Sequence, residues 1–233
     1  MRTCMKDLCE LLSSFLNDNV SLFISVALCI VIPYLLGSVN FALVISKVFY
    51  HDDIRKYGSG NAGMTNMLRT YGKLAAGGTL FCDMFKAVIS VLLGHFFYSQ
   101  WGVGGYMAGF FCVLGHIFPI FFKFKGGKGV ATTAAMILTL DPLCFVFLLI
   151  VFVVIVASTK YVSLGSVISC MIYPVLTYKI AYAGISGWGI GFPVIFSFLT
   201  AATVVFMHRE NISRLRKGTE NKISFSKTSK EKK

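Results

Sequence analysis

Long blocks of apolar residues, separated by short polar stretches, make up most of the chain. A run of about 20 apolar residues is long enough to cross a bilayer as a helix. Only helices and closed barrels satisfy their backbone hydrogen bonds in lipid, and the alternating ten-residue pattern of barrel strands is missing. We therefore predict an all-α integral membrane protein with seven transmembrane segments, at residues 20–48, 74–98, 102–122, 129–140, 143–159, 162–182 and 189–207.

Two of these segments have unusual lengths. Segment 129–140 has only about 12 residues, too few to span a bilayer as a helix. It is therefore expected to be a half-helix or a re-entrant element. Segment 20–48 is long enough to tilt or to end in an interfacial turn.

The charge distribution predicts the topology. The chain has 233 residues, 56% of them hydrophobic, and a net charge of +12. Eighteen of the 22 Lys and Arg residues fall in the connections on one side or in the C-terminal tail, and the opposite connections hold none. This is the pattern of cytoplasmic loops, so we expect the N-terminus outside, the C-terminus in the cytoplasm, and no nucleic acid as partner.

The chain is accordingly divided into three parts. Residues 1–19 are predicted to form an extracytoplasmic N-terminal segment, residues 20–223 the membrane-embedded domain, and residues 224–233 a disordered basic cytoplasmic tail, because the tail is rich in Lys and Ser. Residues 1–19 have no apolar centre of a cleavable signal peptide. Five of the seven cysteines lie in apolar blocks, where cysteine acts as a small hydrophobe, and a Cys4–Cys9 disulfide stays open.

The first polar stretch, residues 58–66, reads GSGNAGMTN and precedes Arg69. Its glycines fit the dinucleotide fingerprint GxGxxG, which requires a preceding strand inside a βαβ unit. Membrane helices flank the stretch instead, so a dinucleotide site is rejected. Glycines still let backbone N–H groups approach an anion closely, although a flexible loop is the alternative. The candidate residues of this stretch are Ser59, Gly60, Asn61, Thr65, Asn66 and Arg69.

The second stretch, residues 115–132, reads GHIFPIFFKFKGGKGVAT. Its Gly-Gly-Lys-Gly turn precedes an apolar helix, so it places a cation and free N–H groups at a helix N-terminus, where the dipole favours anions. The P-loop pattern does not fit around Lys128. A positive-inside loop would explain Lys123 and Lys125, but it explains the glycines poorly. The candidates are Gly126, Gly127, Lys128 and Gly129.

The third stretch, residues 208–215, reads HRENISRL. At helical spacing His208, Asn211 and Leu215 share one face, although an amphipathic helix on anionic lipid would have a similar sequence. Two smaller signals lie within the apolar segments. Asp83 and Lys86, at i and i+3, are close enough for an ion pair, for which a structural role is favoured over a catalytic one. Residues 163 and 166 are serines at the start of a segment.

Several familiar catalytic patterns are absent from the sequence. It contains no GxSxG elbow, no HExxH or paired-Cys metal site, and no histidine followed five positions later by aspartate. The HxxxxD arrangement of the better-known glycerolipid acyltransferases is therefore missing. No nucleophile for an acyl-enzyme intermediate stands out.

Taken together, the motifs resemble the bacterial acyl-phosphate:glycerol-3-phosphate acyltransferases, the PlsY family. The resemblance covers roughly residues 30–220, and Met64 departs from it by replacing a usually small residue. It agrees with seven helices and an outside N-terminus. The stretches that carry it are GSGNAGMTNMLRTYGK (58–73), GHIFPIFFKFKGGKGVAT (115–132), YVSLGS (161–166) and HRENISRL (208–215).

The resemblance implies a reaction and a location. The 1-hydroxyl of sn-glycerol 3-phosphate would attack the carbonyl of an acyl phosphate, giving lysophosphatidic acid and inorganic phosphate, the first step of phospholipid synthesis. The enzyme would need no cofactor and no metal. It would lie in the bacterial cell membrane as a multi-pass protein with its active site facing the cytoplasm, exchanging substrate and product with other enzymes of phospholipid synthesis.

The same resemblance assigns the site residues. An acyl phosphate is already activated, so positioning two anions and stabilising the developing oxyanion are enough, without a covalent intermediate. The proton of the attacking hydroxyl would go either to His208 or to the substrate's own phosphate, and both remain open. The catalytic candidates are Ser59, Arg69, Lys128, His208 and Asn211, and Ser166 joins the substrate-binding group.

Two other classes of protein fit parts of the pattern. A transporter for a phosphorylated solute would account for the half-length segment and the Asp83/Lys86 pair. However, transporters bind substrate near the midplane, whereas the glycine-rich and basic motifs gather at one face. A lipid-binding scaffold would use the basic surface without needing three such motifs.

Overall fold

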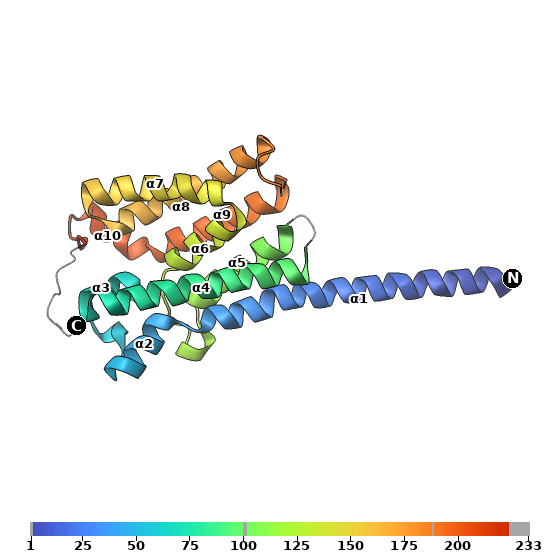
Figure 1. Ribbon diagram of the computed structural model, residues 1–233, viewed down its shortest axis with the longest axis horizontal. Helices are drawn as coiled ribbons and strands as arrows, with labels where there is room; N and C mark the ends of the chain where they lie inside the picture. Colours follow the sequence, from blue (N-terminus) through green and yellow to red (C-terminus); the bar gives the residue numbers. More distant parts are fainter. Residues whose placement is uncertain (1, 100–101, 188, 224–233) are drawn as a thin grey trace.

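The computed structural model describes residues 2–99, 102–187 and 189–223, with side chains described from Val20 onward (Figure 1). The Cys4 and Cys9 side chains and the 224–233 tail lie outside the described parts. The helices are α1 (Arg2–Ser38), α2 (Phe41–Tyr50), η1 (Ile54–Lys56), α3 (Met64–Tyr71), α4 (Lys73–Phe97), α5 (Val103–Ile117), η3 (Ile120–Phe122), α6 (Val130–Leu140), α7 (Pro142–Thr159), α8 (Val162–Tyr182), α9 (Gly191–Met207) and α10 (Arg209–Arg216).

The all-helical membrane architecture is confirmed. Five helical stretches in the described part are long and apolar enough to cross a bilayer: Val20–Tyr50, Lys73–Phe97, Val103–Phe122, Pro142–Thr159 and Val162–Tyr182. Helices α9 and α10, bent by 56° at their junction, make a sixth if they are taken as one span. Helix α6 has 11 residues and is the short element that the sequence predicts. The count of seven spans stays a prediction.

The first predicted segment, residues 20–48, corresponds to one candidate span, Val20–Tyr50, but two helices form it rather than one. Helix α1 already begins at Arg2, and it ends at Ser38. Asn40 then starts α2, because its side-chain oxygen accepts a hydrogen bond from the Leu43 N–H at 3.1 Å. Asparagine at such an N-cap satisfies a backbone donor that the helix itself leaves free. Two polar residues in an otherwise apolar run, Ser38 and Asn40, therefore mark the point where the segment divides into two helices.

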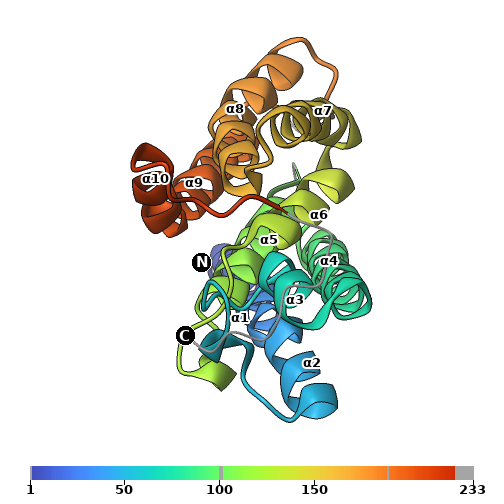
Figure 2. The ribbon, with the colours of Figure 1, turned by 90° about the vertical axis from the view of Figure 1, so that its left-hand side faces the viewer.

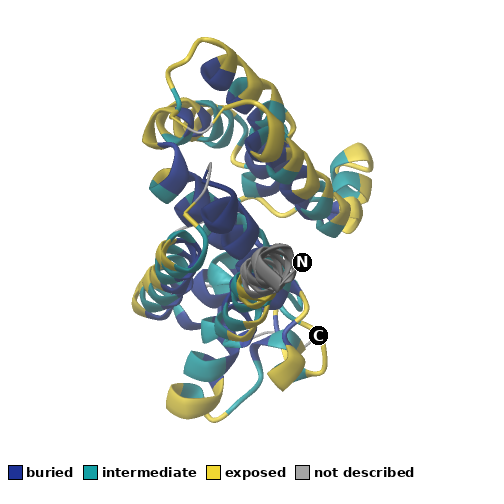
Figure 3. Ribbon diagram, turned by 90° about the vertical axis from the view of Figure 1, so that its right-hand side faces the viewer, coloured by how far each residue is buried: buried dark blue, intermediate teal, exposed yellow. Residues whose placement is uncertain are grey.

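The helices form two groups joined by a central pair. Helices α1–α4 lie on one side and α7–α10 on the other, with α5 and α6 between them (Figure 2). Helix α5 packs on α1 and α4 and also on α9, while α6 packs on α4 and α7. The buried residues accordingly concentrate around the middle of the molecule, and exposed ones face outward (Figure 3). Both groups of helices thus border the same central region.

Glycines allow α5 to approach its neighbours closely. A Cβ on Gly115 would strike the Tyr34 carbonyl oxygen of α1, and one on Gly94 of α4 would strike the Gly104 carbonyl oxygen. Small residues of this kind let membrane helices pack through van der Waals contact where the hydrophobic effect supplies no driving force. The close packing of α1, α4 and α5 therefore depends on these glycines.

A buried lysine ties the same three helices together. Lys86 Nζ donates to the Gly37 carbonyl at 2.9 Å and the Val39 carbonyl at 2.7 Å. It also forms an ion pair with Asp83 Oδ1 at 2.8 Å and lies 3.2 Å from His116 Nδ1. Lys86 is 5% exposed and Asp83 2%. The predicted pair is confirmed. Its lysine supplies hydrogen-bond donors to carbonyls at the end of α1 and in the break after it, which the helix itself leaves without partners.

We predict that Lys86→Met destabilises the protein by about 3–5 kcal/mol, because it leaves a buried carboxylate and two carbonyls without their cation. The midpoint of thermal unfolding in detergent should fall by about 10 °C. Lys73→Met, at an exposed position at the start of the same helix, is the control. Equal midpoints for the two variants would contradict a structural role for Lys86.

Candidate functional site

A cavity of about 380 Å³ lies between the two groups of helices. Side chains from α3, α4, α6, α7, α8 and α10 and from the loops before α3 and α6 line it. Residues of all three predicted polar stretches therefore line one cavity. The predicted site residues that line the cavity are Ser59, Asn61, Thr65, Asn66, Arg69, Lys128, Gly129, Ser166, His208 and Asn211.

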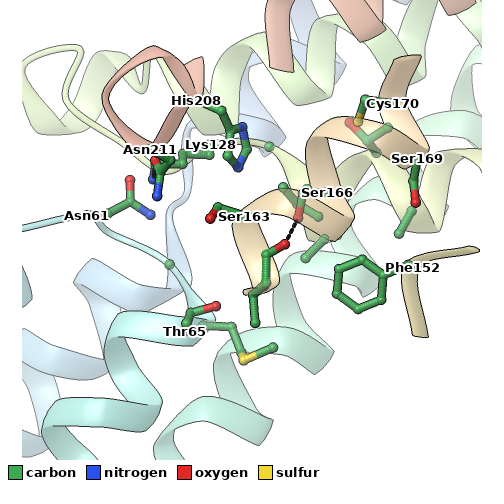
Figure 4. A pocket seen from close by; sticks show the side chains of 18 of the residues that line it. Asn61, Thr65, Lys128, Phe152, Ser163, Ser166, Ser169, Cys170, His208 and Asn211 are labelled. Carbon is green, nitrogen blue, oxygen red and sulfur yellow. Dashed lines mark hydrogen bonds between the residues drawn. The ribbon is translucent and has the colours of Figure 1, made fainter. Parts of the chain in front are cut away.

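The cavity has a polar end and an apolar end. Lys128, His208, Asn211 and Asn61 gather at one end, while Phe152 and its neighbours lie at the other (Figure 4). The apolar lining comes mainly from α6, α7 and α8, and includes Ile137, Phe145, Leu148, Leu149, Phe152, Cys170 and Tyr173. A cavity of this kind suits an amphiphile, with a charged head at one end and a hydrocarbon chain at the other.

Lys128 stands at the polar end in a hydrogen-bonded chain. Its ammonium donates to Asn211 Oδ1, and Asn211 Nδ2 donates in turn to Glu220 Oε1 at 2.6 Å. Burial, together with the positive charge of Arg214, lowers the pKa of Lys128 to about 8. The lysine is therefore mostly protonated at neutral pH. An anion bound beside it would raise its pKa and favour the charged form further.

Glu220 belongs to this network but is not among the predicted site residues. Besides Asn211, its carboxylate accepts from Ser163 Oγ at 2.8 Å and from Arg214 Nε at 2.8 Å. Burial raises its pKa, but the hydrogen bonds from these three donors lower it more, so the pKa lies below its usual value. The available signal was an isolated acidic residue in a strongly basic region, just after Gly218.

Two further hydrogen bonds hold the chain that follows α10. Ile223 N–H donates to the Lys160 carbonyl at 2.8 Å, and the Arg69 guanidinium donates to the Asn221 carbonyl at 3.4 Å. Residues 218–223 thus connect α10 with α3 and with the start of α8. Burial lowers the pKa of Arg69, as expected for a guanidinium drawn into the rim of a cavity.

His208 occupies the 56° bend between α9 and α10. Its Nδ1 lies 2.7 Å from the Val204 carbonyl. A carbonyl only accepts hydrogen bonds, so Nδ1 carries the proton, and in the neutral ring Nε2 keeps its lone pair. His208 is 3% and Asn211 6% exposed, so the face they were predicted to share is turned into the protein.

Asn66 serves the loop more than the cavity. Its Oδ1 accepts from the Ser59 N–H at 3.0 Å, and its Nδ2 donates to the carbonyls of Ile54 at 3.2 Å and Tyr57 at 3.0 Å. These bonds fold residues 54–59 around the start of α3. Asn66 thus positions Ser59 at the cavity.

Three predicted glycines do not reach the cavity. Gly126 N–H donates to the Ile117 carbonyl and Gly127 N–H to the His116 carbonyl, both at 3.1 Å, while Gly60 N–H donates to the Tyr57 carbonyl at 2.9 Å. Their N–H groups are therefore not available to an anion. A Cβ at position 126 would strike the His116 carbonyl oxygen and one at position 127 would strike His116 Nε2, so these two glycines are needed for close packing against the end of α5.

Gly129 differs from these glycines because it lines the cavity and starts α6 with a φ of 82°. The helix turn that follows it begins at the cavity, and the N–H groups of this first turn have no intrahelical partners. Ser166 also lines the cavity, but its hydroxyl donates to the Val162 carbonyl at 2.9 Å (Figure 4). Within the described residues, no group of three His, Cys, Asp or Glu side chains could hold a metal ion.

Comparisons with known proteins agree with this geometry. The sequence profile of the glycerol-3-phosphate acyltransferases matches residues 27–218. A glycerol-3-phosphate acyltransferase of Finegoldia magna is 41% identical over 193 residues, covering 83% of this chain and 93% of that protein. One from Streptococcus thermophilus is 39% identical over 202 residues, covering 86% and 94%.

Two crystal structures are similar over most of the chain. Both are of PlsY (YgiH), an integral membrane glycerol 3-phosphate acyltransferase, at 32% identity. The glycerol 3-phosphate form has a TM-score of 0.75 and covers 86% of this chain and 96% of the PlsY chain. The lysophosphatidic acid form has a TM-score of 0.71 and covers 88% and 96%.

We predict that Glu220→Gln loosens residues 218–223, because the amide nitrogen that replaces Oε2 faces Arg214 as a second donor. Loss of a charge-assisted hydrogen bond of about 1.5–3 kcal/mol should speed amide hydrogen exchange at Ile223 by roughly tenfold or more. Glu210→Gln is the matched control, since Glu210 is 76% exposed and 3.9 Å from Arg214. Unchanged exchange in Glu220→Gln would refute the anchoring role.

Proposed function

This chain belongs to the glycerol-3-phosphate acyltransferase family, and we propose that it transfers a fatty acyl group from acyl phosphate to the 1-hydroxyl of sn-glycerol 3-phosphate. The products are lysophosphatidic acid and inorganic phosphate. The observation that carries the proposal is the cavity itself, in which a half-buried lysine and an apolar wall border one space. This pairing fits a substrate that has a phosphate at one end and a hydrocarbon chain at the other.

The polar end holds the two phosphates. Lys128 and Arg69 supply positive charge, and the free N–H groups at the start of α6 add the favourable end of a helix dipole. Two free anions repel each other in solution. Binding both of them beside these positive groups offsets the repulsion and holds the reacting atoms in position. Ser59, held in place through Asn66, and Asn211 contribute neutral hydrogen-bonding groups. No protein nucleophile is needed, since phosphate is already a good leaving group.

The attacking hydroxyl loses its proton to one of two bases. The Nε2 atom of His208 keeps its lone pair while Nδ1 donates to Val204, so Nε2 can accept this proton. The phosphate of glycerol 3-phosphate is the other acceptor. Either route ends with the glycerol oxygen bonded to the acyl carbon and the donor phosphate leaving with the electron pair.

The enzyme works from within the membrane, with residues 20–223 as its catalytic domain. The acyl chain lies along the apolar wall formed by α7 and α8, and reaches it sideways from the bilayer. The excess of Lys and Arg on the connections beside the polar end supports an orientation with that end and the C-terminus in the cytoplasm and the N-terminus outside. Its membrane is the bacterial cell membrane.

One of the observations that favoured transport of a phosphorylated solute has a structural explanation. The Asp83/Lys86 pair was the ionisable group at membrane depth that favoured it. Lys86 is engaged by two backbone carbonyls and Asp83, which accounts for its burial as part of the helix packing. The half-length α6 is likewise accounted for as a helix whose N-terminus faces the cavity.

We predict that purified protein forms lysophosphatidic acid from palmitoyl phosphate and labelled glycerol 3-phosphate, with stoichiometric release of phosphate. Lys128→Ala should lower the rate by about 10²–10³ or more, because the charge opposite the phosphates is lost. Lys125→Ala, at an exposed lysine of the same loop, should retain wild-type activity. No lipid product from the wild-type protein would refute the proposal, and robust turnover with acyl-CoA would refute the donor assignment.

The reaction should also depend on the charge of Lys128. With a pKa of about 8 in the free enzyme, the lysine is protonated below that pH and loses its charge above it. We therefore expect kcat/KM for glycerol 3-phosphate to fall roughly tenfold per pH unit above about 8. In Lys128→Arg this alkaline limb should disappear, since a guanidinium stays charged. An unchanged limb in that variant would assign it to another group.

A further inference from the structure

The apolar end of the cavity is closed by packed side chains. Among the described residues, the last one on α6 to line the cavity is Ile137, and the last one on α8 is Tyr173. Leu140, about one turn beyond Ile137, and Thr177, about one turn beyond Tyr173, are buried and do not line the cavity. The cavity therefore stops at Ile137 and Tyr173, at the end away from Lys128.

A hydrophobic core fills the space behind this closed end. Ile137, Leu148 and Tyr173 line the cavity and belong to one cluster of buried side chains, which continues to Leu140. Phe145, which also lines the cavity, packs against the same cluster. Ile137 is 4% exposed and Tyr173 2%. Because protein interiors are close-packed, a ligand chain cannot extend past these side chains without displacing them.

The distance from the charged end to this closed end follows from a single helix. Gly129 lies at the start of α6, next to Lys128, and Ile137 lies eight residues further along the chain. At the rise of an α-helix this separation is about 12 Å. A fully extended palmitoyl chain is longer than this distance, whereas a decanoyl chain has a similar length. With the phosphate of the donor beside Lys128, the closed end would contact a palmitoyl chain well before its last carbon.

A chain longer than the cavity has to bend. Helix α7 is the least buried of the five candidate spans, so the side of the cavity that it forms is the side nearest to the bilayer. Its Leu149 lines the cavity and is 43% exposed, whereas the neighbouring Leu148 is 7% exposed. The excess carbons would therefore turn toward α7 and the lipid. Ordering a chain in one bent path costs conformational entropy, which weakens the binding of a long donor relative to one that fits.

We propose that Ile137 determines how long an acyl chain the cavity accepts without bending, and thereby helps to select the acyl donor, an assignment that rests on the proposed function. A smaller side chain at this position would deepen the cavity, and a larger one would shorten it. Ile137 suits this role better than Tyr173, because it lies on the helix that begins at the charged end and because its side chain has only apolar atoms. Glycerol 3-phosphate has no hydrocarbon chain and would not contact this end.

A competition between two donors tests this role. Decanoyl phosphate and palmitoyl phosphate are supplied together with glycerol 3-phosphate, and the ratio of the two lysophosphatidic acids is measured by mass spectrometry. Ile137→Ala should raise the palmitoyl-to-decanoyl ratio about threefold or more, and Ile137→Phe should lower it by a similar factor, since burial of one methylene group corresponds to about a fourfold change.

The matched control is Val146→Phe. Val146 follows Phe145 on α7, but it is 49% exposed and does not line the cavity. This variant should keep the ratio within about twofold of the wild-type value. Ile137→Val, which removes a single methyl group, should shift the ratio in the same direction as Ile137→Ala by a smaller factor, and it replaces Ile137→Ala if that variant does not fold.

The product ratio separates this role from a general loss of stability. Both donors react with the same enzyme molecules, so the ratio does not depend on the fraction of folded protein. Opposite shifts in Ile137→Ala and Ile137→Phe support the proposal. An unchanged ratio in both variants, or a shift in the same direction in both, overturns it. A wild-type protein that forms neither lysophosphatidic acid would refute the proposed function itself, so the two failures are distinguishable.

Discussion

The packing of α1, α4 and α5 depends on the contacts of the buried Lys86 ammonium. A charge taken out of water is tolerated only when oxygen atoms surround it, and here they come from Asp83 of α4 and from the carbonyls of Gly37 and Val39 at the end of α1. The same ammonium lies 3.2 Å from His116 on α5. One side chain thereby holds the break after α1 against two other helices.

This arrangement extends to both glycine-rich loops. The His116 carbonyl accepts from the Gly127 N–H, and its ring lies against Gly127, so the turn before Lys128 is built directly on α5. Asn40, just after the break, donates to the Ala62 carbonyl at 3.2 Å in the first loop. The loops that carry Ser59 and Lys128 are therefore both attached to the packed helices α1, α4 and α5.

The motifs predicted the residues around the cavity better than their roles. Gly126 and Gly127 were expected to offer N–H groups to phosphate, but backbone carbonyls already occupy them. Spacing in a sequence shows that a glycine is needed, but not whether a ligand or a neighbouring helix needs it. Glu220 was not among the predicted site residues for the converse reason. Its importance comes from Asn211 and Arg214 of α10 and from Ser163 of α8, a helix that lies far from α10 along the chain.

The sequence by itself determined the membrane-embedded helical architecture, the short α6 and the motifs that meet at the cavity, because apolar run length and glycine or cation content are local properties that need no knowledge of neighbours. Only the tertiary structure decided the break after Ser38, the structural place of Asn66 and the hydrogen-bond network around Glu220. Each of these depends on which donors and acceptors are brought together from separate helices, and hydrogen-bond partners are set by packing in space rather than by order along the chain.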